Sequence, residues 1–178
     1  MSKKVLVATE KPFSPAAVEQ LTEVFNAANY DVQLLESYTD KADLLAAVGD
    51  VDAMIIRSDK VTAEVLDAAK QLKIVVRAGA GYDNIDCAHA ADKDVVAMNT
   101  PGQNSNAVAE LVFGMMVTNA RNNYNGKPGT ELRGKKIGIH AYGNVGINVA
   151  RVAHGFEMDV YAFDPFVDDE AIKKDGVT

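Results

Sequence analysis

The sequence predicts an α/β protein in which parallel strands alternate with helices, and three observations carry this prediction. Short apolar runs of strand length alternate with segments whose apolar residues recur at helical spacing. The strand-like runs are continuously apolar, which is typical of strands covered by helices on both faces. Hydrophobic residues make up 48% of the 178 residues and charged residues 24%, which excludes a disordered chain.

The first hundred residues contain five strand-like runs, and the segments between them are predicted to be helical. Ser14 suits a helix N-cap and Pro15 the first helical position. We expect a doubly wound, flavodoxin-like layer over residues 1–99, although a single α/β domain that continues to the end is an alternative. The predicted strands are 4–8, 32–35, 52–57, 73–77 and 94–98, and the inward helical residues are Val18, Leu21, Val24, Phe25, Ala28, Leu44, Leu45, Val48, Val65, Leu66 and Ala69.

A long apolar helix is predicted over residues 104–120, with a polar start that suits an N-cap. Its apolar residues surround it, so we expect it to be mostly buried. Residues 122–129 are the most linker-like stretch in the chain. The alternation of strand and helix starts again at Lys135.

The strongest chemical signal is a glycine turn between a strand at 136–140 and a helix. A second strand follows at 160–163 and ends in Asp164, which is the layout of a dinucleotide-binding βαβ unit. Gly143 lets the backbone approach a pyrophosphate, and Gly146 lets the helix pack closely on the strand. The backbone amides near Asn144 and Val145 lie at the start of the helix, where an anion is stabilised.

Asp164 indicates which dinucleotide the turn accepts. At the tip of the second strand, its carboxylate can accept hydrogen bonds from ribose hydroxyls and would repel a 2′-phosphate. Residues 165–169 contain no Arg that could bind such a phosphate, so we predict NAD as the cofactor. The first glycine of the usual pattern is replaced by Ala141, whose Cβ causes strain unless its φ is negative.

A second anion site is predicted where two earlier strands end. Arg57 and Ser58 follow one strand, and the small residues of 77–81 follow the next. The carboxyl ends of parallel strands are where ligands bind in α/β sheets. Together these residues could hold a small phosphorylated carboxylic acid; the alternative is that Arg57 caps a helix or forms a surface ion pair.

Charge and cysteine content exclude several other classes of protein. The chain has 25 acidic and 18 basic residues, which argues against a nucleic-acid partner. The single cysteine, Cys87, excludes a disulfide framework and a Cys-cluster metal site, and we expect it to be buried. No signal peptide or membrane span is visible, so we predict a cytoplasmic protein without membrane partners. His89, His140 and His154 are interpreted as structural, with His140 in a core strand.

These blocks, in this order, resemble the D-isomer-specific 2-hydroxyacid dehydrogenases. Within that family the similarity is greatest to the short enzymes that act on 3-phospho-D-glycerate. It implies a substrate-binding domain over residues 1–99 and the N-terminal part of a Rossmann NAD-binding domain over 100–178. The residues that carry the resemblance are Arg57-Ser58, the run from Arg77 to Asp86, Asn99-Thr100-Pro101-Gly102, Val108-Ala109-Glu110, the glycine turn and Asp164-Pro165.

The resemblance also implies roles for individual residues. Arg57 and Ser58 would contact the phosphate of the substrate, the amides of Ala78 and Gly79 its carboxylate, and Asn104 would lie nearby. The implied cofactor contacts, which include those of the glycine turn, are Ala80, Gly143, Asn144, Val145, Gly146 and Asp164. The implied reaction is the NAD-dependent oxidation of 3-phospho-D-glycerate to 3-phosphonooxypyruvate, which opens serine synthesis. The complete protein is expected to be a homodimer or a higher oligomer.

The acid–base group of the family is not matched in this chain. The family uses a His paired with a Glu, and an Arg that polarises the carbonyl, and no residue here fits those motifs. We therefore predict no catalytic residue and no metal site in these 178 residues, and expect the chain to be inactive alone. Two alternatives stay open: another D-2-hydroxyacid dehydrogenase of the glyoxylate or hydroxypyruvate reductase type, and a non-catalytic nucleotide-binding module.

Overall fold

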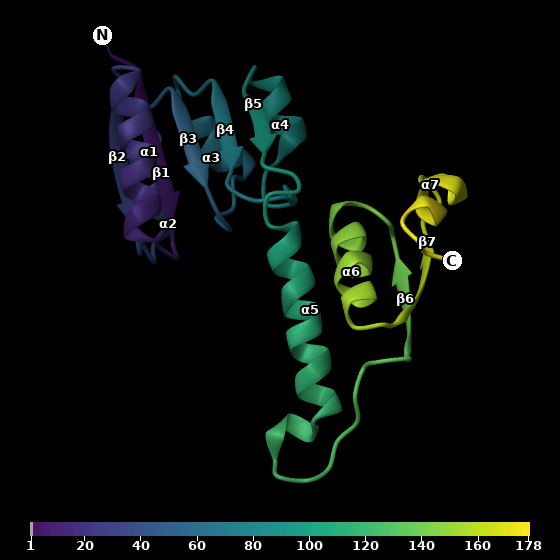
Figure 1. Cartoon of the computed structure of the whole chain (residues 1–178). Coiled ribbons are helices and arrows are strands. Elements are labelled where there is room, and N and C mark those ends of the chain that lie inside the picture. Colours follow the sequence, from purple (N-terminus) through teal and green to yellow (C-terminus); the bar gives the residue numbers. More distant parts are fainter. Residues whose placement is uncertain (1) are drawn as a thin grey trace. The chain divides into compact units, whose positions relative to one another are not determined.

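The chain forms two compact units, Met1–Thr100 and Pro101–Thr178, in a computed structural model that describes residues 2–178. The first unit contains five strands and four helices, and the second contains two strands, three α-helices and one 3-10 turn (Figure 1). In chain order the elements are β1 Lys4–Thr9, α1 Pro15–Ala27, β2 Asp31–Glu36, α2 Lys41–Ala47, β3 Ala53–Ile56, α3 Ala63–Ala68, β4 Ile74–Arg77, α4 Cys87–Asp92, β5 Val96–Asn99, α5 Ser105–Ala120, η1 Asn122–Tyr124, β6 Lys136–His140, α6 Asn144–Gly155, β7 Asp159–Phe163 and α7 Asp169–Lys174.

The first unit is a parallel sheet with the strand order β2-β1-β3-β4-β5. This is the order of the doubly wound, flavodoxin-like fold, so the predicted fold class is confirmed. The chain leaves β1 toward one edge of the sheet and β3 toward the other. The switch point therefore lies between the loops that follow β1 and β3, and this is where such sheets bind ligands.

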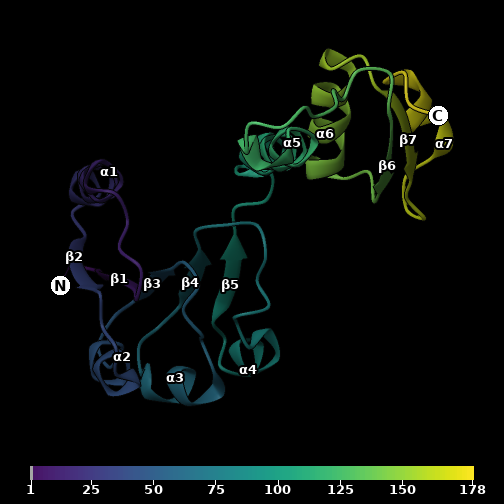
Figure 2. The ribbon, with the colours of Figure 1, turned by 90° about the horizontal axis from the view of Figure 1, so that it is seen from below.

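Helices lie on both faces of this sheet, and alternate residues of its central strands pack against them. Figure 2 shows α1 on one face and α2, α3 and α4 on the other. On β1, Leu6 faces the core under α2, α3 and α4, whereas Val5 and Val7 face the core that Leu21 and Phe25 of α1 complete. Fully covered strands explain why the central runs are continuously apolar.

The expectation of cover on both faces is wrong at the edges of the sheet. Val96 and Met98 of β5 are 56% and 50% exposed, and Leu34 of β2 is 45% exposed. The core on the α1 side contains residues of β1 and β3 but none of β5. One helix cannot cover the whole face, so the apolar run of β5 lies partly in water.

Helix α1 begins as predicted, but its apolar stripe is narrower than predicted. Ser14 is the N-cap, its Oγ accepts a hydrogen bond from the Ala17 amide at 3.3 Å, and Pro15 is the first helical residue. Leu21 and Phe25 pack on the sheet. Val24 is 66% exposed, because it lies to one side of the stripe that Leu21 and Phe25 form.

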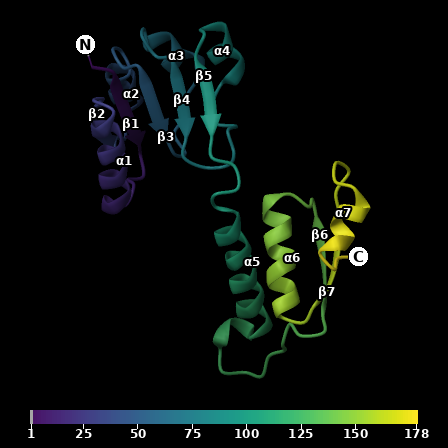
Figure 3. The ribbon, with the colours of Figure 1, turned by 45° about the horizontal axis from the view of Figure 1, so that its top comes forward.

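The second unit is built around one βαβ unit, in which β6 and β7 are parallel and α6 connects them. Figure 3 shows α5 beside α6. At the other side of β7, the Thr178 amide donates to the Val160 carbonyl and the Ala162 amide donates to the Thr178 carbonyl, both at 3.0 Å. This is the arrangement with which a Rossmann sheet begins.

Three sequence-based expectations about burial are wrong, two in the second unit and one in the first. Helix α5 buries only Ser105, Ala109 and Phe113, because α6 covers one side of it. His140 is exposed, since it lies on the face of β6 and β7 that faces away from the core. Cys87 is exposed as the first residue of α4, whose buried residue is Ala90.

None of the helices in residues 2–178 is long and apolar enough to cross a membrane. In the same residues, no cluster of three or more His, Cys, Asp and Glu side chains could hold a metal ion.

Candidate functional site

The glycine turn presents unpaired backbone amides at the start of α6. Gly143 is the N-cap, and the Ile147 amide makes the first hydrogen bond of the helix, to the Gly143 carbonyl at 3.0 Å. The amides of Asn144, Val145 and Gly146 therefore have no acceptor within the helix. All three are residues predicted to contact the cofactor, and such an end of a helix binds anions.

Gly146 is required by the packing of the helix on the strand. A Cβ on Gly146 would overlap the Ala141 carbonyl and lie 3.3 Å from Cγ2 of Ile139. By contrast, a Cβ on Gly143 would meet nothing within 4 Å. The absence of a side chain thus serves helix packing at Gly146, and it leaves open space beside the backbone at Gly143.

Ala141 adopts the left-handed conformation, with a φ of +86°. The alternative that its φ is negative is therefore wrong, and the Cβ strain is present. The turn holds this conformation because the Ala141 amide donates to the Phe163 carbonyl at the end of β7, at 2.8 Å. Strain of this kind persists where surrounding contacts fix the backbone.

Asp164 stabilises the glycine turn through hydrogen bonds. Its two carboxylate oxygens accept hydrogen bonds from the backbone amides of Tyr142, at 2.7 Å, and Phe166, at 2.8 Å. The bonds from Phe166 and then Tyr142 hold the pKa of Asp164 below its usual value, so it stays ionised at neutral pH. A carboxylate has about four acceptor positions, so the two that are free can accept ribose hydroxyls.

Tyr142 connects the turn to the end of α7, a contact that the sequence analysis missed. Its hydroxyl donates to Asp175 at 2.9 Å, and its ring is buried. Burial and the neighbouring Asp175 raise the pKa of Tyr142 to about 12. The Asp175 carbonyl also accepts a hydrogen bond from Nε2 of His154 at 3.0 Å, which agrees with a structural role for that histidine.

Arg57 lies at the switch point of the first unit. Its Nη1 donates to the carbonyls of Lys11, at 3.0 Å, and Pro12, at 2.9 Å, and its guanidinium lies over the ring of Phe13 at 5.4 Å. Within residues 2–178 it forms no ion pair. The guanidinium thus spans the crevice between the loops after β1 and β3, and its Nε and Nη2 groups are left for a ligand.

Ser58 is exposed beside Arg57 and lines a cavity of about 420 Å³. The cavity lies between the loops after β1, β2 and β3, and two lysines, Lys41 and Lys60, take part in its wall. The Oγ1 of Thr62 is buried there without a hydrogen-bond partner. The wall thus offers donors for an oxyanion, while the Glu10 carboxylate also lines it and Lys41 pairs with Glu64.

The segment after β4 is held by internal hydrogen bonds. The amide of Ala78 donates to Ile56 and the amide of Gly79 to Arg77, both at 2.8 Å. The carbonyl of Ala80 accepts a hydrogen bond from the Asn99 side chain at 2.6 Å. Both amides are engaged, so their binding to a substrate carboxylate requires a change of partner and stays a prediction.

Gly79 has no side chain because the Arg77 guanidinium occupies that space. A Cβ on Gly79 would overlap this guanidinium, whose Nε donates to the Arg57 carbonyl at 2.9 Å. Asn104 is the N-cap of α5, is exposed, and makes no side-chain capping bond. Because it belongs to the second unit, its part in a common site with Arg57 stays a prediction.

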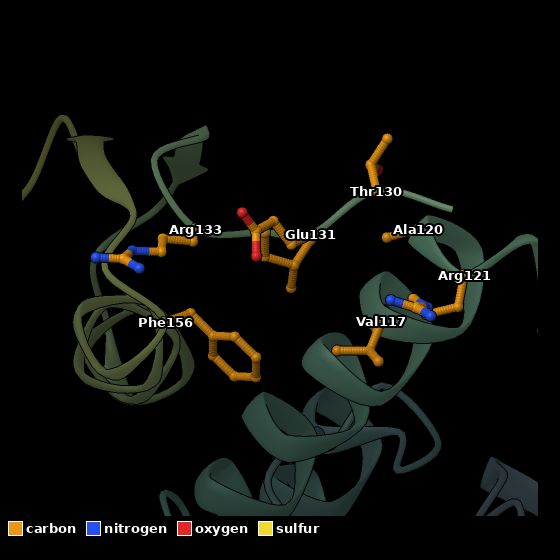
Figure 4. A pocket seen from close by; sticks show the side chains of 8 residues that line it. Val117, Ala120, Arg121, Thr130, Glu131, Arg133 and Phe156 are labelled. Carbon is orange, nitrogen blue, oxygen red and sulfur yellow. The ribbon is translucent and has the colours of Figure 1, made fainter. Parts of the chain in front are cut away.

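A separate cavity of about 230 Å³ lies at the other end of α6 from the glycine turn. In Figure 4 the side chains of Val117 and Phe156 point toward one another across it. Arg121, Glu131 and Arg133 form its charged rim, and Arg133 pairs with Glu157 at 2.9 Å. None of the predicted site residues lines this cavity.

Comparison with known proteins identifies relatives along the whole chain. Residues 5–176 match the family model for the catalytic domain of the D-isomer specific 2-hydroxyacid dehydrogenases. The D-3-phosphoglycerate dehydrogenase of Archaeoglobus fulgidus is 38% identical over 98% of this chain, which covers 34% of that protein. The hydroxypyruvate reductase of Thermotoga maritima is 36% identical over 76% of this chain, which covers 49% of that protein.

Solved structures show the same relationship. The NAD+-bound 3-phosphoglycerate dehydrogenase of Entamoeba histolytica is 43% identical, with a TM-score of 0.91, over 96% of this chain and 56% of that one. The D-lactate dehydrogenase of Escherichia coli, at 23% identity and a TM-score of 0.78 over 98% of this chain and 58% of that one, shares the fold. The chain thus spans between about a third and a little over half of the length of these relatives.

Proposed function

The chain belongs to the D-isomer specific 2-hydroxyacid dehydrogenase family, and we propose that it contributes the substrate-binding domain and the front of the NAD-binding domain to an enzyme that oxidises 3-phospho-D-glycerate. The observation that supports an NAD-dependent dehydrogenase best is the second unit. Its elements have the order of a dinucleotide-binding βαβ unit: β6 is followed by the unpaired amides of the glycine turn, then by α6, and then by Asp164 after β7.

The residues of the turn fit NAD. The unpaired amides from Asn144 to Gly146 would hold the pyrophosphate, and the ionised Asp164 would accept the ribose hydroxyls. When bound, NAD supplies the acceptor for the hydride of the substrate. The negative charge of Asp164 disfavours the 2′-phosphate of NADP at the same position.

The residues of the first unit fit a phosphorylated acid. Arg57 offers its remaining guanidinium donors and Ser58 its hydroxyl at the crevice between β1 and β3. A planar guanidinium can hold a phosphate through two parallel hydrogen bonds. The product would be 3-phosphonooxypyruvate, and the reaction would then be the first step of serine synthesis. By the family resemblance, the general acid–base group would be a His paired with a Glu, and no residue of this chain was matched to it.

A second candidate is a hydroxypyruvate reductase, which the relative from Thermotoga maritima favours. Hydroxypyruvate carries no phosphate, so the contribution of Arg57 decides between the two. In a complete enzyme that contains this chain, Arg57→Ala should lower kcat/KM for 3-phospho-D-glycerate by about 100-fold, as expected for a lost charged contact. Activity with unphosphorylated 2-hydroxy acids should change little. An equal loss with both kinds of acid would exclude phosphate recognition by Arg57.

A further inference from the structure

The turn after β3 contains a buried carboxylate that the proposed function does not use. Asp59 is 3% exposed and follows Arg57 and Ser58 directly. Burial of a charge is unfavourable unless hydrogen bonds or an opposite charge compensate it. A buried carboxylate beside an exposed anion site therefore requires a role that an apolar residue could not fill.

Each hydrogen bond of this carboxylate comes from a different loop at the carboxyl edge of the sheet. One oxygen accepts from the Glu10 amide, after β1, and from the Tyr38 hydroxyl, after β2, both at 2.8 Å. The other oxygen accepts from the Arg57 amide, after β3, at 3.2 Å. Asp59 thus joins the ends of three adjacent strands, β2, β1 and β3.

All the partners of Asp59 are donors, so the site selects a carboxylate over an amide. An amide group in its place would direct its own N–H toward a donor. A tyrosine hydroxyl is protonated at neutral pH and can donate, and burial and the neighbouring Asp59 raise the pKa of Tyr38 further. The ring of Tyr38 is also buried, so this hydroxyl has little access to water as a replacement partner.

The main chain of the same turn is fixed from its other side by Asn84 and Arg77. The Asn84 side chain donates to the Asp59 carbonyl at 2.8 Å, and Nε of Arg77 donates to the Arg57 carbonyl at 2.9 Å. The loop after β1 that Asp59 holds at Glu10 continues directly into Lys11 and Pro12. These are the residues whose carbonyls hold the Arg57 guanidinium.

We propose that Asp59 is the positioning residue of the anion site, and that its carboxylate fixes both the main chain of Arg57 and the loop that directs the Arg57 guanidinium. Asp59 does not touch the ligand. It sets the affinity for the phosphorylated end of the substrate by holding the guanidinium in one orientation before binding, which lowers the entropy lost on binding. The identity of the ligand in this inference rests on the proposed function. The claim that Asp59 fixes the orientation of the Arg57 side chain does not depend on it.

The test compares this chain with its Asp59→Asn variant by NMR, at a temperature where circular dichroism shows both to be folded. Asp92→Asn, an exposed change of the same kind on α4, is the matched control, and Tyr38→Phe removes a single donor. One measurement follows the Arg57 guanidinium signals without ligand. The other titrates 3-phospho-D-glycerate, with NAD as a second ligand that binds the other unit.

The proposal predicts that Asp59→Asn averages the Arg57 guanidinium signals and weakens 3-phospho-D-glycerate binding roughly tenfold, with NAD binding and the Asp92→Asn control unchanged. Tyr38→Phe should give a smaller effect of the same kind. Unchanged Arg57 signals and affinity in folded Asp59→Asn would overturn the proposal. If the parent chain binds no 3-phospho-D-glycerate, binding of this acid by these residues alone is excluded, the Arg57→Ala test in the complete enzyme decides the substrate, and the Arg57 signals decide the role of Asp59.

Discussion

Ala141 shows how the second unit holds an unfavourable backbone conformation at its glycine turn. Its φ of +86° lies in the region that favours glycine, and the hydrogen bond to Phe163 fixes it there. The Asp164 carboxylate holds the next amide, that of Tyr142. The geometry of the turn therefore comes from the end of β7 as well as from the turn residues.

Replacing Ala141 by glycine should relieve this strain. We expect Ala141→Gly to raise the free energy of unfolding of the second unit by about 1 kcal/mol. The measurement is amide hydrogen exchange of Val160 and Ala162 in β7, with and without the substitution. As a control, Ala162→Gly, at a strand position, should lower stability; a decrease in both variants would show that Ala141 is not strained.

Asp164 should make the free energy of unfolding of the second unit depend on pH in the acidic range. Its pKa is lowered from 3.8 in the folded chain, so its contribution is present above that value and is lost as the pH falls through the folded pKa. Asp164→Asn removes this contribution, and the variant should lose less stability than the parent on acidification below about pH 4. Parallel curves from thermal unfolding of the two proteins over this range would contradict the prediction.

At the scale of elements, the strands and most helix boundaries could be predicted because apolar runs and caps are local signals. The exposure of α5 could not be predicted, because its apolar residues surround it and no pattern shows which side a neighbour covers. The φ of Ala141 and the bonds of Asp59 depend on strands far away in sequence. Arg57 and Asp164 could be named as candidate site residues from the sequence, whereas the hydrogen bonds that Asp59 and Tyr142 make beside them could not.

The packing of α6 on β6 depends on the absence of a side chain at Gly146. We expect Gly146→Ala to lower the free energy of unfolding by about 1–3 kcal/mol, since the added Cβ overlaps the Ala141 carbonyl. Gly138→Ala is the matched control, because a Cβ there meets nothing within 4 Å. Chemical denaturation of both variants measures the difference, and equal stability of the two would show that α6 can shift freely.

The uncovered side of α5 is an apolar surface that we expect to support self-association. Leu111 and Met115 are 61% and 58% exposed on this helix, and exposed apolar surfaces of this kind favour protein contacts. Leu111→Lys together with Met115→Lys should lower the apparent mass in sedimentation at high concentration. Val24→Lys, which changes an apolar residue of α1 that is 66% exposed, should have no effect; an equal effect would indicate nonspecific association.

At the scale of the whole molecule, the residues of the two predicted sites lie in separate units. The first unit gathers Arg57 and Ser58 at its switch point, and the second presents the glycine turn and Asp164. No acid–base histidine was assigned in this chain, so it should form no NADH from 3-phospho-D-glycerate by itself. We expect binding of the nucleotide to be the part of the reaction that these residues perform alone.

The most direct test is an NMR titration of the chain with NAD and NADP, which follows the amides of the glycine turn. The account predicts that NAD shifts the amides of Asn144, Val145 and Gly146, that NADP binds about tenfold more weakly, and that Asp164→Asn reduces this difference. Equal affinity for the two nucleotides, or NAD-dependent shifts confined to residues outside the turn, would contradict it.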